Sequence, residues 1–206
     1  MYKRLIDKLK EHEKNHCEEY YFKIRELDRR DDFATMDEVE HAARLIYLNK
    51  TCFNGLYRVN AKGFFNVSSA KKSVVKTFNE DNFNAIKNYF ATKDVLVFNQ
   101  DYAKTVETAV RGDFVYFDPP YDAFPDKNGF VNYGKNGFGR DEQIRLRNCF
   151  KQLSDRGAFV MLSNNNTPFI NELYKGFNIH VVNAKRMINS DPNSRGDVQE
   201  VIITNY

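Results

Sequence analysis

The chain has 206 residues, which is enough for one large domain or two small ones with a real hydrophobic core. Its formal net charge is only +3, although 29% of the residues are charged and 15% are aromatic, so its composition permits nucleic-acid contact without requiring it. No apolar run approaches the length that a bilayer requires and the N-terminus is charged, so we expect neither a membrane span nor a signal peptide.

Cysteine and histidine positions bear on the compartment and on metal binding. Cys17, Cys52 and Cys149 are scattered without a Cys-x-x-Cys pair, which predicts reduced thiols in a cytoplasmic protein and no zinc site. His12 and His16 are four residues apart beside Cys17, but Lys and Glu crowd this segment. A solvated helical face is therefore the preferred interpretation, and we predict no metal site.

The first third of the chain is predicted to be helical. Residues 1–28 carry apolar side chains among many charges and indicate an amphipathic helix. A second helix is expected to begin near Asp37, with Glu40 three residues further on, and its buried stripe comprises Ala42, Ala43, Leu45, Ile46 and Leu48. A third is expected over residues 81–90.

Residues 51–67, called the reading segment below, alternate aromatic side chains with Asn, Arg and Lys and contain two glycines. This pattern favours a turn-rich excursion. Arg58 can form a fork with guanine O6 and N7, Asn54 can bond a base edge or phosphate, and Leu56 can touch a thymine methyl. The alternative is a glycine-rich hairpin with a surface arginine.

The pattern changes to α/β near residue 93, so we predict two parts, a helical and target-recognition region over 1–92 and a catalytic region over 93–206. A strand is expected over Val95–Phe98. Asp101 then suits the N-cap of a helix that ends near Arg111.

The run from Phe114 to Phe117 predicts a short, fully buried strand that stops at Asp118-Pro119-Pro120-Tyr121. In open α/β sheets, ligands bind outside the carboxyl ends of the strands. Asp118 and the Pro119 carbonyl offer two acceptors, which suit the two hydrogens of an aromatic exocyclic amine, and Tyr121 can stack on the ring. The alternative is a strand followed by a Pro-Pro turn.

The remaining elements continue the alternation. A long loop over 122–139 adjoins the Asp-Pro-Pro-Tyr motif, and its length suggests a lid. The expected elements after it are a helix over 140–154, a strand over 158–162, a helix capped by Thr167 with Pro168 in its first turn, and strands over 177–182 and 198–204.

Several motifs occur together in an order that is more specific than any one of them. They are Asn54-Gly-Leu-Tyr-Arg-Val-Asn60, Phe65-Asn-Val67, Asp118-Pro-Pro-Tyr121, Leu162-Ser-Asn164 and Ser194-Arg-Gly196. In this order the chain resembles the family of DNA adenine-N6 methyltransferases that modify GATC, over its whole length. The resemblance implies a Rossmann-like class I methyltransferase sheet of α/β class with an inserted helical target-recognition region.

The resemblance also implies an activity and roles for particular residues. The activity is methyl transfer from S-adenosylmethionine to a flipped adenine of double-stranded DNA, with Asp118, Pro119, Pro120 and Tyr121 as the catalytic motif. Asp118, Asp101 and Tyr102 are expected to contact the cofactor. The expected DNA-binding residues are Phe53, which enters the duplex, Arg58, which reads guanine, and Asn54, Leu56, Asn60, Lys71, Ser194 and Arg195.

Two departures from the family qualify these expectations. Ser68 stands where the family has a proline that helps to read thymine, which weakens the expectation of strict GATC recognition. The family's N-terminal glycine-loop segment, which holds the cofactor, has no counterpart, so we expect it to be absent or separately encoded. The alternatives are an inactive, truncated methylase that only binds DNA, and a methyltransferase for another amine such as cytosine N4 or a protein amide.

Overall fold

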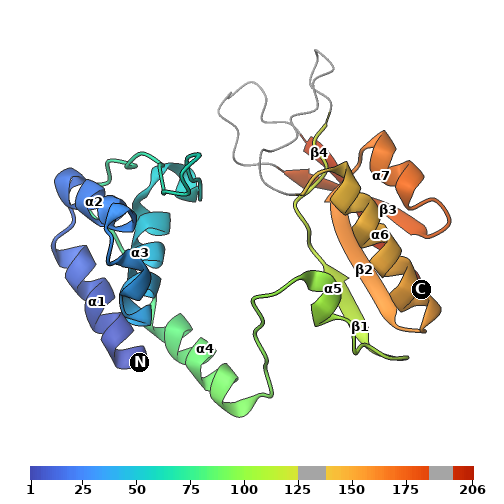
Figure 1. Ribbon diagram of the computed structural model, residues 1–206, viewed down its shortest axis with the longest axis horizontal. Helices are drawn as coiled ribbons and strands as arrows, with labels where there is room; N and C mark the ends of the chain where they lie inside the picture. Colours follow the sequence, from blue (N-terminus) through green and yellow to red (C-terminus); the bar gives the residue numbers. More distant parts are fainter. Residues whose placement is uncertain (125–137, 186–196) are drawn as a thin grey trace. The chain divides into compact units, whose positions relative to one another are not determined.

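The computed structural model describes residues 1–124, 138–185 and 197–206. The chain divides into two compact units, Met1–Leu96 and Val97–Tyr206, and each is described by itself. The first unit is helical, and the second is built on a sheet (Figure 1).

The helical unit contains four helices and three short 3-10 turns within the described residues. The helices are α1 (Tyr2–Lys14), α2 (Glu18–Arg25), α3 (Glu38–Thr51) and α4 (Glu80–Thr92), and the turns are η1 (Glu26–Arg29), η2 (Phe33–Thr35) and η3 (Phe53–Gly55). The prediction that α3 begins after Asp37 is confirmed, because the Asp37 carboxylate accepts a hydrogen bond from the Val39 amide at 2.9 Å.

The single helix predicted over residues 1–28 is wrong, because the chain breaks between α1 and α2. Cys17 has an extended backbone, with φ of −154°, and its Sγ accepts a hydrogen bond from the Tyr20 amide. Cys17 therefore caps a new helix. The amphipathic pattern continues across the break and does not reveal it.

The histidine pair lies at this break, and the solvated-face interpretation is wrong for His12. Its ring is buried, its Nδ1 lies 2.9 Å from Tyr20 Oη, and it packs 4.9 Å from the Tyr47 ring. Burial lowers the pKa of His12. His16 bonds Tyr47 Oη at 2.7 Å and the Lys72 carbonyl at 2.9 Å. Among the described residues, no group of three His, Cys, Asp or Glu side chains could hold a metal ion.

A buried ion pair fastens the reading segment to the helices. Arg44 on α3 contacts Asp28 at 2.9 Å and donates to the Arg25 carbonyl at 2.6 Å. Asp28 in turn accepts a hydrogen bond from the Phe65 amide at 2.7 Å. The core beside this pair comprises Tyr21, Ile24, Tyr47, Leu48, Cys52, Phe65 and Val67. Three residues of the reading segment, Cys52, Phe65 and Val67, are therefore part of the helical core.

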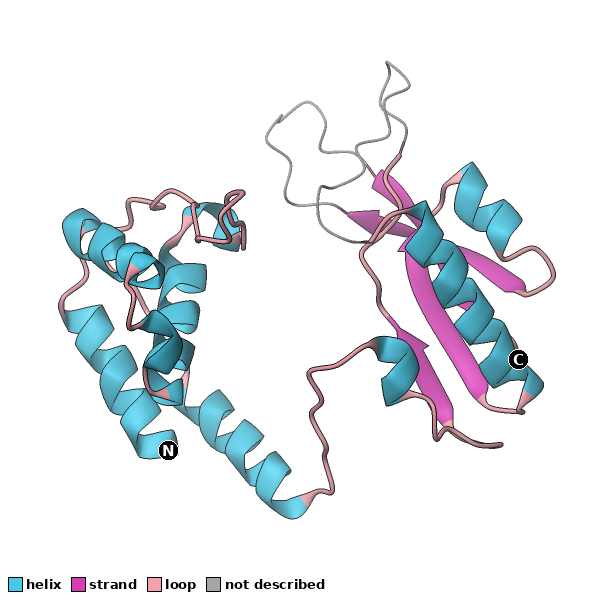
Figure 2. Cartoon of the chain, in the orientation of Figure 1, coloured by secondary structure: helices cyan, strands magenta, loops and turns pink. Residues whose placement is uncertain are grey.

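The second unit is a mixed sheet with helices. Its elements are α5 (Tyr102–Thr105), β1 (Phe114–Phe117), α6 (Arg140–Asp155), β2 (Phe159–Asn165), α7 (Pro168–Leu173), β3 (Asn178–Lys185) and β4 (Asp197–Thr204). The strand order is β1-β2-β4-β3, with β1 parallel to β2 and β4 antiparallel to both of its neighbours. Helix α6 lies along one face of this sheet (Figure 2). The predicted α/β class is confirmed.

The core of the second unit lies between α6 and the sheet. Leu146, Phe150 and Leu153 of α6 pack with residues of the strands, among them Val160, Leu162, Val201 and Ile203. Strand β2 runs three residues further than predicted because its polar end pairs with β4, Asn165 lying opposite Glu200. The predicted cap at Thr167 is confirmed, since its hydroxyl accepts from the Ile170 amide at 3.2 Å.

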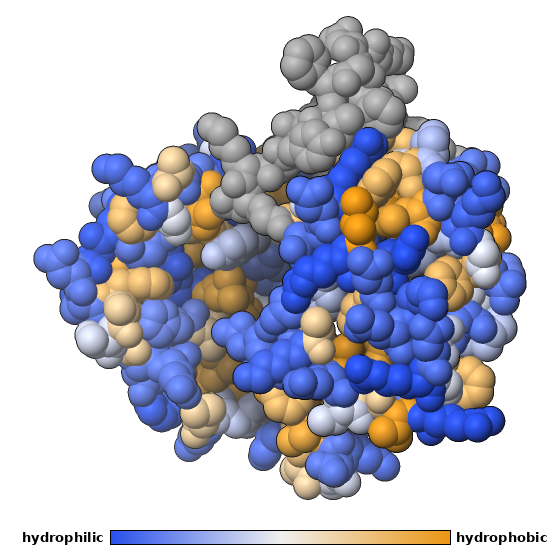
Figure 3. Space-filling model, turned by 45° about the vertical axis from the view of Figure 1, so that its right-hand side comes forward, coloured by the Kyte–Doolittle hydropathy of each residue, from blue (hydrophilic) through white to orange (hydrophobic). Residues whose placement is uncertain are grey.

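The prediction that Phe114–Phe117 is a fully buried strand is wrong. Phe117 is buried, but Phe114 and Tyr116 are more than half exposed. Successive side chains of a strand point to opposite faces, and within the described residues α6 covers only one of them. Hydrophobic residues interrupt the hydrophilic surface in several places on the face seen in Figure 3.

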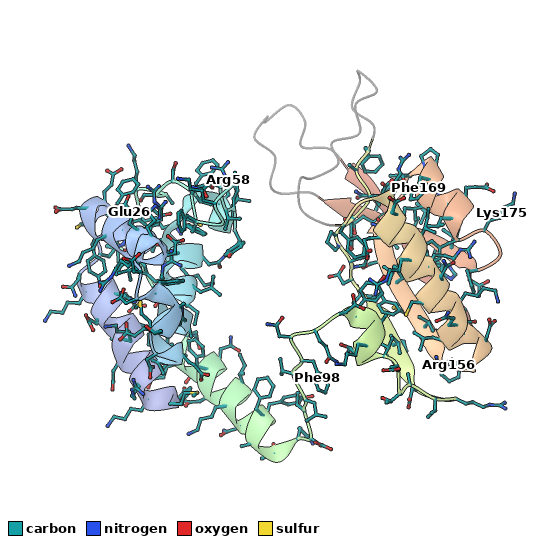
Figure 4. All side chains as sticks on the ribbon, in the orientation of Figure 1. Glu26, Arg58, Phe98, Arg156, Phe169 and Lys175 are labelled. Atoms are coloured by element: carbon teal, nitrogen blue, oxygen red, sulfur yellow. The ribbon has the colours of Figure 1, made fainter. Side chains whose placement is uncertain are left out.

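Val95–Phe98 is not a strand, which corrects a second expectation. This segment has no regular structure, and Leu96 and Val97 are 73% and 81% exposed. Figure 4 labels Phe98 on the irregular stretch of chain between α4 and α5. An apolar run forms a strand only where a neighbour pairs its backbone, and the described residues provide none here. Helix α5 is also shorter than predicted, ending at Thr105 instead of near Arg111.

Candidate active site

The parallel pairing of β1 with β2 brings two chemically useful side chains together. Phe117 lies opposite Leu162, so the residues that follow them, Asp118 and Ser163, are neighbours at the carboxyl ends of the two strands. Ser163 Oγ donates a hydrogen bond to Asp118 Oδ1 at 2.8 Å and lies 3.0 Å from Tyr116 Oη. Asp118 is exposed, and its Oδ2 has no hydrogen-bond partner among the described residues. One carboxylate oxygen is thus held and the other is available.

The turn that follows presents one further acceptor. The Pro120 carbonyl accepts a hydrogen bond from Gln143 Nε2 at 2.8 Å, whereas the Pro119 carbonyl has no partner in the described parts of the chain. Tyr121 is half-buried, and burial raises its pKa, which keeps its phenol neutral. Among the described residues, Asp118 Oδ2 and the Pro119 carbonyl are therefore both acceptors without a partner, and their role as a pair stays a prediction.

Asp101 has the capping role that its position predicts. Its Oδ1 accepts from the Ala103 amide at 3.0 Å, and Arg145 on α6 contacts both carboxylate oxygens, at 2.6 and 3.0 Å. The Arg145 guanidinium holds the pKa of Asp101 below its ordinary value. Asp101 is therefore ionised and tied to α6.

Tyr102 lies beside the end of β1, in partly aromatic surroundings. Its ring centroid is 6.1 Å from Phe117 and 6.3 Å from Phe138, and the Arg145 guanidinium lies 4.8 Å from its ring. Burial raises the pKa of Tyr102 to about 12. Its hydroxyl is buried and has no hydrogen-bond partner among the residues that the structure describes.

In the helical unit, the reading segment forms an exposed hairpin that presents Arg58 (Figure 4). Arg58 Nε donates to Asn66 Oδ1 at 2.8 Å, and Nη2 to the Asn66 carbonyl at 3.4 Å. Phe53 and Leu56 are also exposed. Asn54 adopts the left-handed conformation, with φ of 54°. Four predicted DNA-binding residues thus share one exposed loop.

The other predicted DNA-binding residues divide into three groups. Asn60 forms the hairpin turn, where its Oδ1 accepts from the amides of Lys62 and Phe64 at 2.9 and 3.1 Å. Lys71 is exposed, and its ammonium lies 3.9 Å from Glu18. Ser194 and Arg195 lie outside the described residues, as does most of the predicted lid.

Sequence reasoning gave no role to three residues that lie at this site, Ser163, Asn164 and Gln143. The run of polar residues at the end of an apolar strand is the signal for the first two. Gln143 interrupts the apolar stripe of α6, three residues before Leu146, although it is 1% exposed. A polar residue in a buried helical stripe requires a partner, but the sequence does not name that partner.

Comparisons with known proteins concern the chain as a whole. A family model described as D12 class N6 adenine-specific DNA methyltransferase matches residues 2–188. The chain is 42% identical, over 203 residues, to the type II methyltransferase M1.LlaDCHI of Lactococcus lactis subsp. cremoris. This alignment covers 98% of the present chain and 72% of that protein. It is 43% identical over 190 residues to the type II methyltransferase M.MjaIII of Methanocaldococcus jannaschii, covering 91% of this chain and 65% of the relative.

More distant relatives carry a more specific name. The chain is 30% identical over 189 residues to the DNA adenine methylase of Escherichia coli K12, covering 90% of this chain and 64% of the relative. The chain thus spans about two thirds of the length of several curated relatives that it matches. These comparisons support neither the inactive alternative nor a separately encoded N-terminal partner. In the described ranges, no helix combines the length and apolar character that a membrane crossing requires.

Proposed function

Because the chain belongs to the D12 class of N6 adenine-specific DNA methyltransferases, we propose that it transfers a methyl group from S-adenosylmethionine to N6 of an adenine in double-stranded DNA. The observation that carries the proposal is the Asp118–Ser163 pair at the end of β1, beside a Pro119 carbonyl that has no partner among the described residues. All three cysteines of the chain are free, which suits a protein that acts on DNA in the reducing cytoplasm.

The two acceptors explain how a weak nucleophile is activated. The lone pair of an adenine amine is delocalised into the ring, so the nitrogen is planar and reacts poorly. Asp118 Oδ2 and the Pro119 carbonyl accept the two N6 hydrogens, which favours a pyramidal nitrogen whose lone pair points away from both. The N–C bond then forms as the donor's C–S bond breaks, and N6 loses one proton, which Asp118 can receive and pass to solvent.

When bound, S-adenosylmethionine supplies the electrophilic methyl group. Tyr102 fits a ligand at this place, because its buried hydroxyl lacks a partner among the described residues and Phe117 and Phe138 flank its ring. Asp101 contributes by holding Arg145 beside the Tyr102 ring.

Adenine reaches Asp118 only after it leaves the stack, which costs a few kcal/mol. Tyr121, neutral and half-buried, would stack on the extruded ring and offset part of this cost. With 2-aminopurine at the target position, its fluorescence should rise when the protein binds, and an unchanged signal at saturation would contradict base flipping.

We further propose GATC as the target, because Arg58 retains a free edge for guanine. Asn66 occupies Nε and one hydrogen of Nη2, and Nη1 has no partner among the described residues. Ser68 replaces the family's proline, so discrimination at thymine should be weaker than at guanine. Methylation of duplexes with single substitutions in GATC tests this order, and equal tolerance at guanine and thymine would refute it.

The decisive experiment identifies the product. The protein is incubated with S-adenosylmethionine and GATC-containing duplex DNA, and the nucleosides are analysed by mass spectrometry. We expect N6-methyladenine, and none with Asp118→Ala, which should retain DNA binding because it removes only an acceptor for the reacting amine. N4-methylcytosine as the product, or full activity of the variant, would overturn the proposal.

A further inference from the structure

A buried polar network lies beneath the catalytic turn, outside the residues that would touch the substrate. We propose that Gln143 and Asn164 are positioning residues that hold residues 119–122 in place and thereby set the rate of methyl transfer. This inference rests on the proposed function. Gln143 and Asn164 are 1% and 0% exposed, and they come from α6 and from the end of β2.

The network is a chain of carboxamides that grips the turn on both sides of Tyr121. Gln143 Nε2 donates to the Pro120 carbonyl at 2.8 Å. Asn164 Nδ2 donates to Gln143 Oε1 at 3.1 Å, and Asn164 Oδ1 accepts from the Asp122 amide at 2.8 Å. The helix and the strand therefore fix the backbone immediately before and immediately after Tyr121.

The turn needs this support because it has few hydrogen-bonding groups of its own. Neither Pro119 nor Pro120 has a backbone N–H, so neither can donate to a neighbouring strand. The two side chains provide the missing partners, one donor and one acceptor. By occupying the Pro120 carbonyl, Gln143 leaves the Pro119 carbonyl as the acceptor next to Asp118.

A second arm holds the exit of the turn. The buried Asp122 carboxylate accepts from Thr167 Oγ1 at 2.7 Å and lies 3.5 Å from Arg140 Nε. Thr167 is the N-cap of α7, and Arg140 packs over the Phe169 ring at 4.5 Å. Asp122 is consequently tied to α6 and α7, so the backbone from Pro120 to Asp122 is held at both of its ends.

The chemistry of Gln143 distinguishes positioning from packing. Its amide must donate to Pro120 and accept from Asn164 at the same time, which a carboxylate cannot do. Its neighbours on the same face of α6, Leu146 and Phe150, are apolar, so an apolar residue would fill the position without needing any partner. The value of the amide therefore lies in its contact with the turn.

The experiment compares Gln143→Met and Asn164→Leu with Asn205→Ala. Asn205 is a matched control, because it also cross-links α6 and β2, through Ser154, Ala158 and Val160, but contacts no residue of the turn. We expect the first two variants to lose about tenfold in kcat while Kd for DNA changes less than about twofold, since small misplacement of reacting groups lowers rates steeply. The double variant should lose no more than the worse single one, because the chain is already broken. Asn205→Ala should lower Tm and leave kcat unchanged.

A further variant gives a readout that does not depend on stability. Gln143→Glu cannot donate when ionised, but its neutral acid can donate to Pro120 and accept from Asn164. Its kcat relative to wild type should therefore recover as pH falls from about 8 to about 6, because burial raises the pKa of a carboxyl group.

A folded Gln143→Met protein with wild-type kcat, a loss equal to that of Asn205→Ala, or a pH-independent ratio for Gln143→Glu would each overturn the inference. Failure of the wild-type protein to form N6-methyladenine would instead overturn the proposed function.

Discussion

The hydrogen bond from Ser163 to Asp118 provides the sharpest test of the proposed active site. Ser163→Ala removes the donor that lies 2.8 Å from Asp118 Oδ1 and creates little empty space, because only one oxygen atom is lost. Hydrogen bonds to charged groups contribute about 1.5–3 kcal/mol. Asp118 is exposed, so water can replace the lost donor, and we expect the lower end of this range.

A loss of about 1.4 kcal/mol corresponds to about tenfold in kcat. The assay is single-turnover methylation of a saturating GATC duplex, which isolates the chemical step from DNA binding and product release. Tyr116→Phe is the matched control, because it removes only the hydroxyl 3.0 Å from Ser163 and keeps the bond to Asp118. We expect it to lose about twofold at most.

The outcome separates positioning from stability. Ser163 is buried, so both variants are also compared by Tm. If Ser163→Ala retains the wild-type single-turnover rate, Asp118 needs no orienting donor and the reasoning fails. If Tyr116→Phe loses as much as Ser163→Ala, the outer hydroxyl matters through an effect that the hydrogen-bond chain does not explain.

The remaining predictions concern the helical unit. Asn66→Ala removes the hydrogen bonds that orient the guanidinium of Arg58, and should reduce discrimination at guanine by about 1 kcal/mol in competition binding. Lys71→Ala should instead weaken binding to all duplexes alike. If both variants lose affinity uniformly for all duplexes, Arg58 is a phosphate contact. Burial lowers the pKa of His12, so the unfolded chain binds the proton more tightly than the folded chain does. The contribution of His12 to stability is therefore full above about pH 6.5 and falls as the pH drops below it. His12→Asn should reduce the change of the urea midpoint between about pH 7 and 5.5. Arg44→Met removes the more buried of the two arginines that pair with Asp28, the other being Arg29 at 2.7 Å, and should cost about 2 kcal/mol of unfolding free energy by urea denaturation; a loss below about 1 kcal/mol would contradict the ion pair's role.

The sequence by itself determined the features that depend on a few neighbouring residues. The caps at Asp37, Asp101 and Thr167 occur where the pattern predicts them, because each side chain bonds an amide two or three residues ahead. The end of β1 at Phe117, just before Asp118 and Pro119, is similarly local, since proline cannot extend a strand. The α/β class and the family also followed from patterns along the chain.

Tertiary structure alone decided where apolar patterns end and which faces they bury. The amphipathic pattern of residues 1–28 passes through the cap at Cys17 without interruption. Val95–Phe98 has the composition of a strand but has no paired neighbour among the described residues, and Phe114 and Tyr116 lie on the face of β1 that α6 does not cover. Composition records the preference of a segment, whereas pairing and burial depend on what lies against it.

The partners of the catalytic motif were beyond the sequence for the same physical reason. Asp118 and Ser163 are 45 residues apart, and Asp101 and Arg145 are 44 apart. Such pairs form only when the register of β1 against β2 and the packing of α6 have been set by the whole core. The sequence predicts Asp118 as the acceptor for the amine, and the sheet decided which side chains hold it, because hydrogen bonds between distant elements depend on a register that no local pattern contains.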